Sequence, residues 1–360
     1  MSKIISIGTA VPDHKHDQSA ILNFMQRVYA AGEADRRKLK FLYHQSGIDT
    51  RYSVIPDYSS GAGQWEFYPA TENLEPFPKL ELRMEWYQRY AAQLSVKAID
   101  DCIEKVDRKN ITHLITVSCT GMSAPGLDLE LLELLELPQT TFRTSINFMG
   151  CYAAIHAMKL ADAFCKADRL ANVLIVCTEL CTLHFQKEYS IDNITSSMLF
   201  SDGAAAMLVT GNTDQDGLNI DHFYSSVAFK GKQDMAWQLS SKGFLMTLSA
   251  YIPDMIQENF DGLVTAALDA GGIDKNEITQ WCIHPGGKRI LQAVHKSLGF
   301  SNGQLDICYD ILREYGNMSS PTVLFGLQRI MQVLKDKPGD KIFGAAFGPG
   351  LTMETFILSA

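Results

Sequence analysis

The feature that most constrains this chain is the alternation of short apolar strands with amphipathic helices along most of its length. Such alternation predicts an α/β protein in which helices pack on a sheet with parallel strands. The predicted helices cover residues 19–31, 85–105, 128–137, 151–167, 252–270, 288–298 and 321–334, and the predicted strands cover residues 4–7, 111–117, 141–148, 172–176, 204–209, 281–283, 341–346 and 352–358.

The pattern of the first part partly repeats after Gly211, which suggests two halves. We predict an N-terminal half over residues 1–215 and a C-terminal half over residues 216–360. The 360 residues exceed what one small core needs, and no Pro-, Gly- or Ser-rich linker separates the halves. We therefore expect them to pack tightly around a buried site, with the loop-rich stretch 53–80 as a lid or substrate-entry region.

Charge and cysteine usage narrow the class of protein. A net charge of -9 disfavours nucleic acid and anionic membranes as general partners, because the protein's field repels phosphate. The N-terminus has no signal-peptide pattern, and no apolar run of about 18 residues predicts a membrane span. The eight cysteines have irregular spacings, and none belongs to a finger-like metal pattern. We expect a cytoplasmic protein with reduced thiols and no bound metal.

Cys151 is the best candidate for a nucleophile. A cysteine acts as its thiolate, which the start of a helix and a nearby histidine both stabilise. Cys151 follows Gly150, which permits a tight turn, and it opens a nearly all-apolar predicted helix. The other seven cysteines lack this context, and a buried free cysteine is usually a small hydrophobe.

Two further polar residues follow predicted strands or turns. His284 ends a predicted strand just before Gly286 and Gly287, which let a ligand approach the backbone closely. Asn317 lies in a turn that leads into a helix, where a capping or turn role is as good an interpretation as a catalytic one.

Several motifs taken together resemble those of type III polyketide synthases, the chalcone synthase-like family of the thiolase superfamily. They stand in the family's order and cover nearly the whole chain. The matching segments are residues 6–12, 150–151, 199–206, 281–287, 315–320 and 347–355.

The resemblance implies a thiolase-like fold, with two duplicated α/β halves in a layered αβαβα arrangement, and a homodimer. It also implies an acyltransferase in which Cys151 takes an acyl group from a starter acyl-CoA. Malonyl-CoA then loses carbon dioxide and its enolate attacks the Cys151 thioester, while His284 and Asn317 donate hydrogen bonds to the developing oxyanion. The product would be a pyrone, a resorcinol or a related polyketide. Coenzyme A thioesters are then the substrates, with no cofactor and no carrier protein.

The family's other positions can be transferred residue by residue. The resemblance implies gatekeeper and cavity roles, a cyclisation loop and coenzyme A contacts. The gatekeeper and cavity positions are Phe200, Met246, Cys119, Cys181, His184 and Trp237, the loop positions are Gly348, Pro349 and Gly350, and the coenzyme A positions are Lys38, Gly286 and Gly287. Trp237 stands where many plant members have glycine, so it should restrict the starter or the chain length. Lys38 lies in a basic cluster that is equally well interpreted as a solvated helix face.

Other interpretations stay open. A ketoacyl-carrier-protein synthase III-like condensing enzyme also uses Cys, His and Asn, but it would need a docking patch for an acidic carrier protein. A cysteine hydrolase or a non-catalytic acyl-CoA-binding protein would leave the combined Cys, His and Asn set unexplained. The sequence does not specify the starter, the number of extensions or the ring closure.

Overall fold

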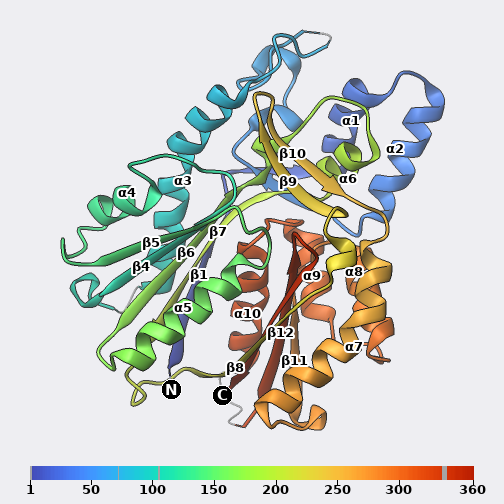
Figure 1. Cartoon of the computed structure of the whole chain (residues 1–360). Helices are drawn as coiled ribbons and strands as arrows, with labels where there is room; N and C mark the ends of the chain where they lie inside the picture. Colours follow the sequence, from blue (N-terminus) through green and yellow to red (C-terminus); the bar gives the residue numbers. More distant parts are fainter. Residues whose placement is uncertain (1, 72, 104–105, 335–338) are drawn as a thin grey trace.

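A nine-stranded mixed sheet forms the frame of the molecule (Figure 1). The structure is a computed structural model that describes residues 2–71, 73–103, 106–334 and 339–360. The strands are β1 Lys3–Ala10, β2 His14–Asp17, β3 Thr50–Ser53, β4 His113–Ser118, β5 Phe142–Asn147, β6 Asn172–Leu180, β7 Asp202–Thr210, β8 Leu218–Val227, β9 Met235–Ser240, β10 Gly243–Leu248, β11 Ile278–Ile283, β12 Lys341–Gly348 and β13 Thr352–Ser359. The α-helices are α1 Gln18–Tyr29, α2 Glu33–Gln45, α3 Leu80–Ile103, α4 Leu127–Leu134, α5 Ala153–Ala167, α6 Ile191–Leu199, α7 Ile252–Gly271, α8 Lys288–Ser297, α9 Asp306–Tyr315 and α10 Pro321–Leu334.

The strand order divides the large sheet into two parts. The order is β11-β12-β13-β8-β1-β7-β6-β4-β5, with parallel pairing of β4 to β5, β4 to β6 and β11 to β12. The two parts meet at β1 and β8, which share only the pairs Lys3 with Asn219 and Ile4 with Leu218. This short junction lets the C-terminal strands turn away from the N-terminal ones.

Helices lie between the two parts of the sheet and on both outer faces. Helix α5 contacts β6 and β13, and α10 contacts β7 and β11, so both helices lie between the parts. Helices α3 and α4 cover the N-terminal strands from outside, and α7 packs on β8 with α8 beside it (Figure 1). The predicted layered order of helix, sheet, helix, sheet and helix is therefore present.

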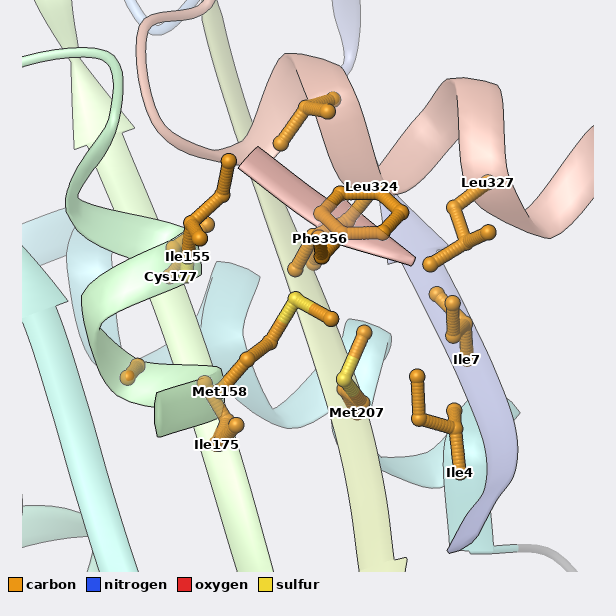
Figure 2. Packing of buried hydrophobic residues seen from close by; sticks show 14 of the residues in the cluster. Ile4, Ile7, Ile155, Met158, Ile175, Cys177, Met207, Leu324, Leu327 and Phe356 are labelled. Atoms are coloured by element: carbon orange, nitrogen blue, oxygen red, sulfur yellow. The ribbon is translucent and has the colours of Figure 1, made fainter. Parts of the chain in front are cut away.

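The central core is apolar and close-packed around α5. Side chains from β1, β6, β7, β13, α5 and α10 meet there (Figure 2). The residues labelled in Figure 2 are Ile4, Ile7, Ile155, Met158, Ile175, Cys177, Met207, Leu324, Leu327 and Phe356. Because this core joins elements from both halves, it fixes the relative position of the loops at their shared edge.

Most predicted elements are present, with shifted boundaries. Strand β6 runs on to Leu180, so Cys177 lies within it and not at its end. Helix α5 begins at Ala153 and not at Cys151. The end of the helix predicted to Lys105 lies outside the described residues. The sequence patterns missed α2, α6, α9 and the strands β2, β3, β8, β9 and β10. The division at residues 215 and 216 stays a prediction.

The stretch 53–80, which we expected to be a lid or substrate-entry region, packs closely on the N-terminal elements, and its role stays a prediction. Asp57 accepts hydrogen bonds from the backbone amides of Glu66, Phe67 and Tyr68, which ties the loop down. Its aromatic rings pack with Phe24 and neighbours in a second core.

No helix in the described part of the chain is both long and apolar enough to cross a membrane.

Candidate active site

A cavity of about 550 Å³ lies where loops of the two halves meet. Residues from α2, α6, the β9–β10 hairpin and the start of α8 line it. Cys151, His284 and Asn317, which are far apart in sequence, all line this one cavity. The structure thus brings together the three residues that the sequence singled out.

A tight turn presents Cys151 to the cavity. Gly150 has a φ of +81°, and a Cβ atom there would lie 2.5 Å from Cδ of Pro349. Only glycine fits such a backbone without strain or displacement. Helix α5 starts two residues after Cys151, so the thiol lies just before the positive end of a helix dipole.

Burial keeps both Cys151 and His284 neutral when each is considered alone. Burial raises the pKa of Cys151 to about 11, and hydrogen bonds from Ser319 and Asn317 oppose this rise only in part. Burial also lowers the pKa of His284 to about 3. Neither ring nitrogen of His284 has a hydrogen-bond partner among the described residues. The imidazole is therefore a neutral group that is free to accept a proton or to donate to a ligand.

The backbone and a side-chain hydrogen bond hold Asn317 in place. Its amide N donates to Leu199 O at 2.9 Å, and Ser201 N donates to Asn317 O at 2.9 Å, so the turn is paired with the end of α6. Its Nδ2 donates to Gly286 O at 3.1 Å. Its Oδ1 accepts from Ser319 N at 2.8 Å, as a turn residue would. Asn317 thus combines a turn role with a position in the cavity.

The predicted cavity residues separate into two groups. Cys119, Phe200, Trp237 and Met246 line the cavity that contains Cys151. Cys181 and His184 instead line a second cavity of about 40 Å³, which also has Phe200 and Met246 in its wall.

The glycine-rich C-terminal loop packs directly on the turn that contains Gly150 and Cys151. A Cβ atom at Gly348 would lie 2.5 Å from the ring of Tyr152, and Pro349 lines the cavity. Gly350 N donates to Met235 O at 3.3 Å, which joins the loop to β9.

The basic groups near the cavity differ from those expected. Lys38 is exposed on α2, lines neither cavity, and lies 5.7 Å above the ring of Tyr189. Gly286 and Gly287 line the main cavity, together with Lys288 and Arg289 at the start of α8. Arg289 is exposed, so this is the solvent end of the cavity. Nothing in the sequence indicated a role for either cation, because both belong to what reads as an ordinary polar helix face.

Glu179 is a third site residue that the sequence patterns did not indicate. It is fully buried in β6, where Cys119 N, Thr120 Oγ1 and Ser320 Oγ donate to its carboxylate. Burial raises its pKa to about 7, and its charge raises the pKa of Cys151. A charged residue inside an otherwise apolar strand was the available signal.

Within the described ranges, no three His, Cys, Asp or Glu residues are grouped as a metal site requires.

Family models match both parts of the chain. The N-terminal domain model of chalcone and stilbene synthases matches residues 1–213, and the C-terminal domain model of the same family matches residues 224–360. Curated relatives include "Probable polyketide synthase 1" of Dictyostelium discoideum, with 29% identity over 98% of this chain but only 11% of that protein. "Putative chalcone synthase" of Bacillus subtilis (strain 168) is 28% identical over 100% of this chain and 99% of its own length.

Solved structures agree with this assignment. The C-terminal type III polyketide synthase domain of 'Steely1', a type I/III hybrid from Dictyostelium, has a TM-score of 0.91 and 27% identity, covering 99% of both chains. PKS-I from the brown alga Ectocarpus siliculosus has a TM-score of 0.91 and 26% identity, covering 99% of this chain and 98% of its own. The chain therefore belongs to the chalcone and stilbene synthase family of type III polyketide synthases, which are condensing enzymes of the acyltransferase class with a thiolase-like fold.

Proposed function

We propose that this protein extends an acyl-CoA starter with malonyl-CoA while the chain is held on Cys151. The observation that carries the proposal is the convergence of Cys151, His284 and Asn317 in one cavity of about 550 Å³. That volume lies within the range of small-molecule sites. The cavity is therefore large enough for a short acyl chain together with the reacting end of an extender.

A proton moves from Cys151 to His284 during the first step. Cys151 gives its proton to His284 and attacks the starter thioester. The coenzyme A thiolate that leaves then takes this proton from His284 and departs as a thiol. The imidazole is available for this step because it is neutral and neither ring nitrogen has a partner among the described residues, while attraction between the thiolate and the imidazolium offsets the burial that opposes each charge. The ion pair is transient, since burial disfavours each charge alone.

Condensation follows from loss of carbon dioxide. Malonyl-CoA releases CO₂, and the electron pair of the broken bond forms an enolate that attacks the Cys151 thioester. His284 and Asn317 donate hydrogen bonds to the oxygen where negative charge develops, which is worth a few kcal/mol for each donor. The carbon–sulfur bond to Cys151 breaks, which leaves the lengthened chain on coenzyme A. For another round the Cys151 thiolate attacks that thioester, and coenzyme A leaves and takes up a proton. The chemistry is redox-neutral, and coenzyme A thioesters are its only organic substrates.

Lys288 and Arg289 are proposed to bind the phosphates of coenzyme A. They stand at the solvent end of the cavity, where α8 begins, and a helix start favours anions. Phe41, which is 65% exposed, lines the same end and offers a ring for stacking. Lys38 would then act only at longer range. Gly286 and Gly287 allow the pantetheine arm to lie close to the backbone.

Ring closure to a pyrone, a resorcinol or a related product is proposed to occur beside Pro349. The loop of Gly348, Pro349 and Gly350 supports this wall, and Trp237 limits the room for the folded chain.

A homodimer is also proposed. Strand β5 is the edge of the large sheet and pairs only with β4 among the described strands. Its side chains are mostly exposed, and Phe142 is 52% exposed, which favours pairing with a second copy.

The reaction can be tested with malonyl-CoA that carries a radioactive label and a panel of acyl-CoA starters. We expect products heavier than the starter by whole ketide units in mass spectra, and none from Cys151→Ala. If extension occurs only when malonate is supplied on a carrier protein, the enzyme is a ketoacyl-carrier-protein synthase III-like condensing enzyme. Free acid without extension would identify a hydrolase.

A further inference from the structure

The second cavity, of about 40 Å³, has several buried polar side chains in its wall, and the proposed reaction steps do not use them. Arg51, His184, Gln186 and Ser196 are among the residues that line it. Arg51 and Gln186 are each only 4% exposed. The volume is too small for an aromatic ring but is sufficient for one or two small polar groups.

Four buried polar atoms on these side chains have no hydrogen-bond partner within the described residues. They are Arg51 Nη2, His184 Nδ1, His184 Nε2 and Gln186 Oε1. The other groups on the same side chains are paired: Arg51 Nη1 donates to Phe200 O at 2.6 Å, and Gln186 Nε2 donates to Phe244 O at 3.2 Å. Buried polar atoms are rarely left unpaired, so a cluster of four indicates a place for a polar guest.

A wall one side chain thick separates the two cavities. Phe200 and Met246 line both. Trp237 lines the main cavity, and its ring meets the ring of His184 edge-on at a centroid distance of 4.3 Å. Met246 is unbranched and flexible, and its Sδ accepts a hydrogen bond from Ser196 Oγ at 3.4 Å, so a change of its rotamer would open the shared wall without moving the backbone. An acyl chain on Cys151 would then extend through this opening into the second cavity.

The hydrogen-bond donors and acceptors in the second cavity determine which chemical group can bind there. The buried His184 is neutral, since burial lowers its pKa, and it offers one donor and one acceptor. Arg51 adds a donor, and Gln186 adds an acceptor. A hydroxyl group can satisfy both kinds, because it donates one hydrogen bond and accepts two. A carboxylate would face Gln186 Oε1, and Asp202 already supplies a negative charge near Arg51.

We propose that this second cavity binds a hydroxyl group at the far end of the starter acyl chain, so that the enzyme prefers hydroxyl-bearing aliphatic starters. The inference rests on the proposed condensing function and adds the class of starter. A methyl group in the same place would leave Arg51, His184 and Gln186 unpaired against an apolar surface, which buried polar groups tolerate poorly.

The test compares acyl-CoA starters that end in a hydroxyl with starters of the same number of heavy atoms that end in a methyl, over a series of chain lengths. The readout is kcat/KM for extension with malonyl-CoA. We expect the hydroxyl-bearing starter to be preferred roughly tenfold at the length that reaches the cavity. A third series that ends in a carboxylate distinguishes an anion site from a hydroxyl site.

Two variants separate the cavity from general effects. His184→Phe keeps a ring against Trp237 and Phe244 but removes both nitrogens, and we expect the preference to fall close to one. His222→Phe is the matched control, because His222 also has an unpaired ring nitrogen among the described residues but lines neither cavity. If His184→Phe fails to fold by circular dichroism, Gln186→Met replaces it and is expected to reduce the preference severalfold.

The outcomes distinguish this inference from the function on which it rests. Equal use of both starters, a preference for the methyl or carboxylate series, or a preference that His184→Phe leaves intact would overturn the hydroxyl site while the enzyme remains a polyketide synthase. Failure of every starter to be extended would instead refute the proposed function, and the inference with it.

Discussion

Glu179→Gln tests the account of the buried polar centre through the pH dependence of stability. The carboxyl of Glu179 is fully buried in β6, and burial raises its pKa from 4.5 to about 7. Between these two values the folded protein binds a proton that the unfolded chain does not. The free energy of unfolding therefore falls as the pH rises from about 4.5 through 7, and this contribution is absent once Glu179 is replaced.

The size of the effect follows from the shift in pKa. A tenfold change in proton affinity corresponds to about 1.4 kcal/mol, so a rise in pKa from 4.5 to about 7 corresponds to about 3.5 kcal/mol over the whole titration. Glutamine also places an amide opposite Cys119 N, a donor, which costs stability at every pH. That cost does not depend on pH and cancels when one pH is compared with another.

Urea unfolding of the wild type and of Glu179→Gln at pH 5 and pH 8, at one protein concentration, measures the effect. We expect the stability of the wild type relative to the variant to fall by about 2.5 kcal/mol between these pH values, since part of the full effect is already lost at pH 5. Groups that do not interact with Glu179 titrate equally in both proteins. The thiols that do interact with it, among them Cys119 and Cys177, have pKa values that burial raises above this window. A difference that stays constant with pH would show that Glu179 is ionised at its ordinary pKa and would refute the reasoning.

Three further substitutions test other parts of the site. Gly150 has a φ of +81°, and the Cβ of an alanine there would lie 2.5 Å from Pro349. Gly150→Ala should therefore lower the free energy of unfolding by about 1–3 kcal/mol in thermal unfolding and reduce the extension rate. A variant that matches the wild type in both measurements would contradict the idea that this turn requires glycine. Trp237→Gly should shift the products in mass spectra towards longer chains, and an unchanged distribution would show that Trp237 does not limit the cavity. Arg289→Glu should raise KM for coenzyme A thioesters about tenfold at low salt, and the rise should be smaller at high salt. The value of kcat should change less than KM does. Lys38→Glu carries the same charge change outside the cavity, and an equal effect there would argue against a phosphate site at α8.

The fold was predictable to the extent that it depends on periodicity. Buried strands such as β6 and β7 are runs of apolar residues, and α10 begins and ends where its pattern does. The patterns failed for α2, which has only two buried residues, Leu39 and Tyr43, and therefore lacks a clear apolar face. They also failed for the β9–β10 hairpin, whose strands pair mainly with each other and are partly exposed.

The candidate site was predictable where backbone geometry leaves a sign in the sequence. Gly150 before Cys151, and the glycines after His284, mark turns that the structure contains. Cys181 and His184 were assigned to the elongation cavity through the family resemblance, but they line the second cavity, which shares Met246 with the first and whose His184 meets the ring of Trp237. Such a division depends on side-chain volume in three dimensions, which no spacing rule records.

The most direct test of the central claim is to trap the acyl-enzyme. The protein is incubated with an acyl-CoA starter in the absence of malonyl-CoA, and intact mass spectrometry with peptide mapping locates the adduct. The account predicts one acyl group per chain on Cys151 and none in Cys151→Ala, with the other seven cysteines unmodified. An adduct on Cys119 or elsewhere that persists in Cys151→Ala, or no adduct from any starter that the enzyme extends, would contradict Cys151 as the nucleophile.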